Sequence, residues 1–138
     1  MIFLDANFIM SLLIGNLKEH ETATKIYEQI KNQPLVISNS IILEVMTVSN
    51  IKIKVPKEKL EDIYNKINSG VFEIIEDISL YDDTLKRQII YHPKRLPFFD
   101  CLYLEVMEQL GITKIASFDK HFNNIKGIER IPVSKLVQ

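Results

Sequence analysis

Short apolar runs, typical of strands that are buried on both faces, recur along the chain. The clearest are residues 2–4 (Ile-Phe-Leu) and residues 35–37 (Leu-Val-Ile). Similar runs predict further strands at residues 71–75, 114–117 and 128–131. Each run has the length of a short strand rather than of a helix.

Between these runs, apolar residues recur at helical spacing. They predict helices at residues 7–14, 17–30, 56–67, 79–91 and 98–110, and one that Ser38 or Asn39 caps and that runs to about residue 49. Gly111 is expected to end the last helix. Strands that alternate with helices predict an α/β fold, a three-layer α/β/α sandwich with a mostly parallel central sheet. Because the chain is too short for a second core, we expect residues 1–138 to form a single domain.

Four acidic residues stand out because apolar residues surround them. Asp5 ends the first strand, Glu44 interrupts an apolar helix, Asp100 follows two phenylalanines and Asp119 ends the fourth strand. Asp5, Glu44 and Asp100 have no Lys or Arg within four residues, so no local ion pair offsets the cost of burying their charge.

The carboxyl ends of parallel strands and the helix N-termini that follow them meet at one edge of a sheet. The four acids map to that edge, where their charges repel each other unless a divalent cation neutralises them. Carboxylate oxygens favour Mg²⁺ or Mn²⁺ over zinc. Asn7, Ser40 and Ser117 lie near the same strand ends, and we expect them to support the carboxylates.

A structural explanation stands beside the metal hypothesis. Asp100 and Asp119 have the positions of helix caps, Glu44 fits a solvated helix face, and Glu105 also lacks a local basic partner. The three histidines show no ligand spacing and are expected at the surface, and Cys101 is expected to be a small buried hydrophobe. Spacing alone leaves the metal site and the structural explanation open.

Composition narrows the class of protein. The 17 Lys and Arg residues balance 18 Asp and Glu residues, so no global positive field attracts nucleic acid. A single cysteine excludes an internal disulfide, and neither a basic leader nor an apolar run of membrane-spanning length occurs. We therefore expect a cytoplasmic protein in which any nucleic-acid site is a local patch.

Four motifs in order resemble the PIN domain family, and the chain length resembles its VapC-type toxins. The motifs are residues 3–7 (FLDAN), residues 37–40 (ISNS) with Glu44 after them, residues 96–100 (LPFFD) and residues 115–122 (IASFDKHF). The resemblance covers essentially the whole chain. Ser117 stands where Thr is more usual in the family, which keeps the hydroxyl group.

The resemblance implies a Mg²⁺- or Mn²⁺-dependent ribonuclease, the toxin of a type II toxin-antitoxin pair. It assigns the metal and the catalysis to Asp5, Glu44, Asp100 and Asp119. It also implies an RNA substrate and a protein antitoxin, and the apolar excess in residues 7–30 and 40–50 leads us to expect a homodimer.

Basic residues near the late helix are candidate RNA contacts, namely Arg87, Lys94 and Arg95. Two alternative functions remain at this point. One is a catalytically silent PIN-like module that binds RNA or protein. The other is a receiver-like domain that accepts phosphate, although only Asp5 supplies an early acid where a receiver needs a pair.

Overall fold

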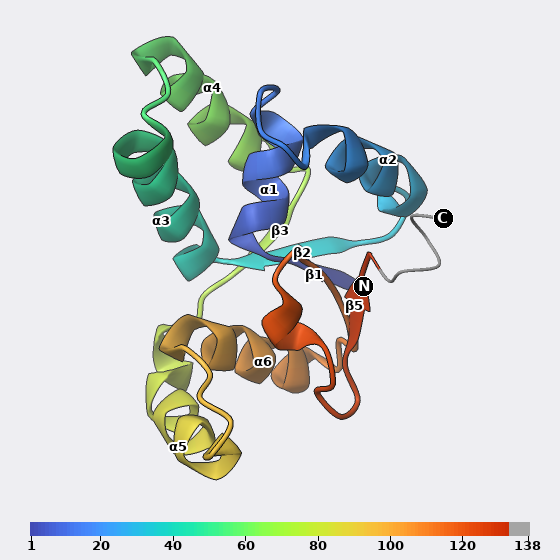
Figure 1. The fold of residues 1–138 in the computed structure, drawn as a ribbon, viewed down its shortest axis with the longest axis vertical. Coiled ribbons are helices and arrows are strands. Elements are labelled where there is room, and N and C mark those ends of the chain that lie inside the picture. Colours follow the sequence, from blue (N-terminus) through green and yellow to red (C-terminus); the bar gives the residue numbers. More distant parts are fainter. Residues whose placement is uncertain (133–138) are drawn as a thin grey trace.

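The computed structural model describes residues 1–132 and has three layers (Figure 1). The central sheet has five strands, β1 (Ile2–Leu4), β2 (Leu35–Ser38), β3 (Glu73–Ile75), β4 (Lys114–Ala116) and β5 (Glu129–Ile131). Their order is β3-β2-β1-β4-β5, and every neighbouring pair is parallel. The predicted α/β/α sandwich is confirmed, with a described sheet that is parallel throughout.

Six α-helices cover the sheet. They are α1 (Ala6–Leu13), α2 (His20–Ile30), α3 (Asn39–Val48), α4 (Lys57–Ile67), α5 (Tyr81–Tyr91) and α6 (Phe98–Leu110). Figure 1 shows α1 to α4 on one side of the sheet and α5 and α6 on the other. None of the described helices is both long and apolar enough to span a membrane.

The strand β1 lies at the centre of the sheet because its residues are apolar on both faces. Ile2, Phe3 and Leu4 are at most 1% exposed, and the ring of Phe3 packs against Tyr103 of α6 with 5.5 Å between centroids. Asp5 follows this strand directly, so it enters the interior with the strand.

Several predicted boundaries differ from the structure by a few residues. The helix predicted at residues 17–30 begins only at His20, because the chain makes turns after Gly15 in which the Leu17 N–H donates to the Ile14 carbonyl. The strand predicted at residues 71–75 begins at Glu73. After α3 the chain adds one π-helical turn, Ser49–Ile53. The C-terminal cap at Gly111, with φ of +68°, is as predicted.

The strand order contradicts the receiver-like hypothesis. Receiver domains have the order 2-1-3-4-5, in which the first strand is not followed by the fourth. Here β1 pairs with β2 on one side and with β4 on the other. The carboxyl ends of β1 and β4, and the residues that follow them, therefore lie side by side.

Candidate active site at the carboxyl edge of the sheet

Asp5 is buried where β1 meets α1, and both of its carboxylate oxygens accept hydrogen bonds. Oδ1 accepts from the Ala6 N–H at 2.8 Å, which caps the helix. Oδ2 accepts from the Ser117 hydroxyl at 2.7 Å and from the Asn7 side-chain amide at 3.2 Å. Asp5 is only 4% exposed, so these contacts fix the direction of its carboxylate.

Asn7 and Ser117 join the ends of β1 and β4. Asn7 Oδ1 accepts from the Phe118 N–H at 3.0 Å, and the Ser117 hydroxyl accepts from the Asp119 N–H at 3.0 Å. Both residues also donate to the Asp5 carboxylate. A serine at position 117 is sufficient for these contacts because only the hydroxyl group takes part.

The pKa of Asp5 is raised to about 7. Burial is the largest cause, since it penalises the charged form, and the negative charges of Glu44 and Asp100 raise the pKa further. The hydrogen bonds from Ser117 and Ala6 oppose this shift and do not cancel it. Among the ion pairs of residues 1–132, none provides Asp5 with a cation that would stabilise its carboxylate form.

Asp100, Asp119 and His121 form a second cluster at the same edge. His121 Nδ1 lies 2.8 Å from Asp100 Oδ2 and 3.2 Å from Asp119 Oδ1. Burial raises the pKa of Asp100, the hydrogen bond to His121 lowers it, and the charges of Asp119 and Glu44 raise it. One ligand atom from each of the three residues lies within 4.8 Å of the others, a spacing that suits a metal ion.

Glu44 reaches the acids from α3 and is held by a tyrosine of α6. The Tyr103 hydroxyl donates to Glu44 Oε1 at 2.7 Å. Burial, followed by the charge of Glu44, raises the pKa of Tyr103 far above its usual value, so the hydroxyl keeps its proton and remains a donor. Because the charge of Glu44 acts on both Asp5 and Asp100, it belongs to the same cluster of acids.

Ser40 does not lie among the four acids. Its hydroxyl donates to Asp77 Oδ1 at 3.0 Å and its N–H to Asp77 Oδ2 at 3.3 Å. Asp77 is fully buried, and its own N–H donates to Asn39 Oδ1 at 2.7 Å. Ser40 therefore fixes the first turn of α3 to the segment after β3, and it can support Glu44 only through the position of the helix.

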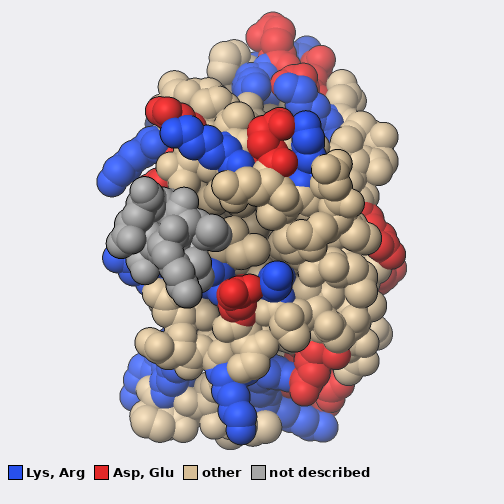
Figure 2. Space-filling model, turned by 90° about the vertical axis from the view of Figure 1, so that its right-hand side faces the viewer, with Lys and Arg blue, Asp and Glu red and all other residues tan. Residues whose placement is uncertain are grey.

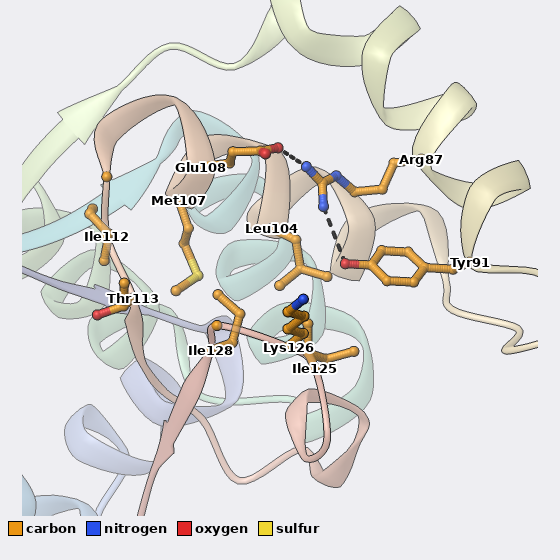
Figure 3. A pocket seen from close by; sticks show the side chains of 12 residues that line it. Arg87, Tyr91, Leu104, Met107, Glu108, Ile112, Thr113, Ile125, Lys126 and Ile128 are labelled. Atoms are coloured by element: carbon orange, nitrogen blue, oxygen red, sulfur yellow. Dashed lines mark hydrogen bonds and ion pairs between the residues drawn. The ribbon is translucent and has the colours of Figure 1, made fainter.

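Arg87 contacts other acids, in the C-terminal half of α6. Its Nε donates to Glu105 Oε1 at 2.8 Å, and its other nitrogens contact Glu108 and the Tyr91 hydroxyl. Figure 3 shows Arg87 between Tyr91 and Glu108 on the wall of a cavity of about 230 Å³. None of the four acids lines this cavity, and the guanidinium is already engaged by two carboxylates.

The other two basic candidates, Lys94 and Arg95, are exposed in the loop before α6. Lys94 Nζ donates to the Asn123 carbonyl at 3.3 Å, and its charge lowers the pKa of His121, so it lies near the acids. Figure 2 shows acidic and basic side chains mixed over one face of the molecule.

Sequence analysis missed His121, Tyr103 and Asp77. His121 has no second histidine at ligand spacing, but it follows Asp119 by two residues, and Asp119 Oδ1 accepts from its N–H at 2.8 Å. This Asp-x-His turn is a local signal that could have placed the imidazole. Tyr103 and Asp77 carry no such signal, since their partners are 59 and 37 residues away.

Comparisons with known proteins agree with this architecture. The sequence model of the PIN domain matches residues 2–128. No curated protein matches the chain. Among solved structures, VapC20 of Mycobacterium tuberculosis, described as a sarcin-ricin loop cleaving toxin, is 20% identical, with a TM-score of 0.75 and coverage of 87% of this chain and 91% of that chain.

Two toxin-antitoxin structures are also similar. DNA-bound VapBC from Salmonella typhimurium is 12% identical, with a TM-score of 0.67 and coverage of 94% of this chain and 95% of that chain. A toxin-antitoxin complex from Klebsiella pneumoniae is 17% identical, with a TM-score of 0.64 and coverage of 94% and 96%. At these identities the structures show a shared fold, and the family match extends over most of the sequence: the chain belongs to the PIN domain family.

Proposed function

We propose that the protein is a Mg²⁺- or Mn²⁺-dependent endoribonuclease and the toxin of a type II toxin-antitoxin pair. One observation carries the proposal: burial and neighbouring acids at the carboxyl edge of the sheet raise the pKa of Asp5 and of Asp100, and no lysine or arginine offsets this. Within residues 1–132, the ion pairs of Lys and Arg include none of Asp5, Glu44, Asp100 and Asp119.

The donor set fits a divalent cation. Carboxylate oxygens from two strand ends and two helices converge on one edge, and oxygen ligands suit Mg²⁺ and Mn²⁺. The raised pKa of Asp5 supports this choice, because a neighbouring cation would supply the missing positive charge. We assign Asp5, Glu44 and Asp100 as principal ligands, and Asp119 as the ligand of a second ion or of water.

A bound divalent ion would lower the pKa of a coordinated water and neutralise charge on the phosphate oxygens. The chain's own residues provide the alignment. Ser117 and Asn7 hold the Asp5 carboxylate, and Tyr103 holds the Glu44 carboxylate through its hydroxyl. Fixed carboxylates would present one face to the scissile phosphodiester, so the residues that orient them contribute to the rate.

The loop before α6 is the proposed contact for the RNA backbone. Lys94 and Arg95 are exposed and close in sequence to Asp100, so they could bring phosphates towards the acids. We do not propose Arg87 as an RNA contact, because Glu105 and Glu108 already engage its guanidinium.

We also propose a protein antitoxin and a homodimer. Exposed apolar side chains on and after α3 and on α4 support a docking surface: Leu43 is 63% exposed, Ile51 66% and Tyr64 53%. An arginine from an antitoxin would satisfy the carboxylates at the site in place of a metal ion. Two of the similar structures are toxin-antitoxin complexes, which agrees with a partner of this kind.

Cleavage of RNA by the purified protein tests the proposal. Single-stranded and structured RNAs are incubated with Mn²⁺, with Mg²⁺ or with a chelator. We expect cleavage only with metal, and none by Asp5→Asn. Binding without metal-dependent cleavage would instead favour the catalytically silent PIN-like module, and cleavage in chelator would contradict the metal site.

A further inference from the structure

An imidazole nitrogen faces two of the four acids at the carboxyl edge. His121 Nδ1 is 2.8 Å from Asp100 Oδ2 and 3.2 Å from Asp119 Oδ1. The remaining site ligands proposed above offer only oxygen. The site is therefore a mixed set of oxygen donors and one nitrogen donor.

The backbone fixes the position of His121. Asp119 caps a short 3-10 turn, Lys120–Phe122, and its Oδ1 accepts from the His121 N–H at 2.8 Å. The side chain of Phe122, next along the turn, is 1% exposed and anchors the turn in the core. The imidazole is thus held beside Asp100 although the two residues are 21 positions apart.

Core packing does not explain why a histidine side chain lies beside Asp100. The His121 side chain is 53% exposed, so it fills no core volume, whereas the side chain of Asp100 is only 12% exposed. A single exposed ion pair contributes little to stability. It also leaves Asp5 and Glu44 without a cation.

We propose that His121 is a metal ligand together with Asp100 and Asp119, and that its nitrogen makes the site prefer Mn²⁺ over Mg²⁺. This inference rests on the proposed metal-dependent function. Imidazole suits transition-metal ions, whereas Mg²⁺ takes oxygen ligands and keeps its waters. Removal of the ring should therefore weaken the binding of the two ions unequally.

The test measures metal binding by the full chain rather than activity. Calorimetry gives the affinities of Mn²⁺ and Mg²⁺ for the wild type, His121→Ala and the control His92→Ala, which removes another exposed histidine. Pulsed electron paramagnetic resonance of bound Mn²⁺ reports any coupled ¹⁴N nucleus. Urea unfolding in chelator confirms that both variants are folded.

We expect the wild type and His92→Ala to bind Mn²⁺ more tightly than Mg²⁺ and to show the nitrogen coupling. His121→Ala should lose the coupling and about 10-fold or more of its Mn²⁺ affinity, with a change of less than about 3-fold for Mg²⁺. Bound Mn²⁺ without nitrogen coupling, or an equal loss for both ions, would overturn the role of His121 alone. If the wild type bound neither ion, the metal site itself would be refuted.

Discussion

The two halves of α6 hold buried carboxylates in different electrostatic settings. In the C-terminal half the Glu105 side chain is 10% exposed, and Arg87 Nε lies 2.8 Å away. Near the N-terminal end the Asp100 side chain is 12% exposed, and its nearest cationic partner is the half-exposed ring of His121. The two side chains are buried to a similar degree, and they differ in the positive charge that their partners supply.

This comparison separates structural acids from functional ones. A buried carboxylate with a guanidinium partner is part of the packing between α5 and α6. Buried carboxylates that face one another without such a partner raise their own pKa values and weaken the fold unless a cation binds. We therefore place RNA cleavage at the acids beside Asp100, which have no guanidinium partner.

The largest expected effect is on catalysis. Asp100→Asn should lower RNA cleavage by more than about 100-fold, because it removes a charged metal ligand while it keeps the shape of the side chain. Glu105→Gln, on the same helix, should leave the rate constant of the folded enzyme nearly unchanged. Single-turnover cleavage in Mn²⁺ measures the rate constants of both variants. Equal losses would remove the distinction between Asp100 and Glu105.

The second effect is on the stability that the Arg87–Glu105 ion pair provides. Arg87→Met leaves the Glu105 charge buried without a partner and should lower the free energy of unfolding by about 2–3 kcal/mol. The double variant Arg87→Met, Glu105→Gln should recover much of this loss, since no charge is then left buried. Urea unfolding gives the values. A double variant as unstable as Arg87→Met would mean that packing rather than charge sets the cost.

The third effect is the pH dependence of the metal-free protein. The folded chain holds the Asp5 proton up to about pH 7, whereas an ordinary carboxyl loses it near pH 3.8. Between these values the unfolded chain binds fewer protons, so the free energy of unfolding falls as pH rises from about 4 to about 7, by up to about 1.4 kcal/mol per pH unit.

The raised pKa of His121 acts with the same sign above its ordinary value of 6.5, because a stabilising ion pair is lost as pH rises. Urea midpoints in chelator from pH 4 to 8 measure the slope. Asp5→Asn should flatten it. An unchanged slope in that variant would show that Asp5 is not the group that titrates.

The smallest expected effect concerns RNA binding by the exposed loop. Lys94→Ala with Arg95→Ala should weaken RNA binding a few-fold. The slope of log affinity against log salt concentration should become shallower by an amount that corresponds to about 1 to 2 lost phosphate contacts. The matched control is Lys25→Ala with Lys31→Ala, two exposed lysines in α2 and at its C-terminal cap that pair with glutamates. An equal loss of affinity in the control would indicate a diffuse charge effect rather than a site.

The fold was largely predictable because β1 and β2 are apolar on both faces, a pattern that few other elements share. The positions of Asp5, Asn7 and Ser117 also followed from the sequence, since parallel strand ends meet at one edge. Glu105 shows the limit of such reasoning. It lacked a local basic partner just as Asp100 did, and only the packing of α5 on α6 brings Arg87 to it.

The contacts of Ser40 and Tyr103 could not be predicted because they join residues far apart in the sequence. Ser40 was expected among the acids, but Asp77, 37 residues away, engages its hydroxyl. Tyr103 has the spacing of a core aromatic, and its hydroxyl finds Glu44 only because α3 and α6 approach each other at the sheet edge. Partners at such separations leave no periodic signal in the sequence.

The most direct test of the central claim is urea unfolding with and without Mn²⁺ at pH 7.5, for the wild type and Asp5→Asn. If the acids at the carboxyl edge of the sheet lack only a cation, saturating Mn²⁺ at 100 times its Kd should raise the free energy of unfolding of the wild type by about 2.7 kcal/mol. Asp5→Asn should gain far less. An absent gain in the wild type, or an equal gain in both proteins, would contradict a metal centre built on Asp5.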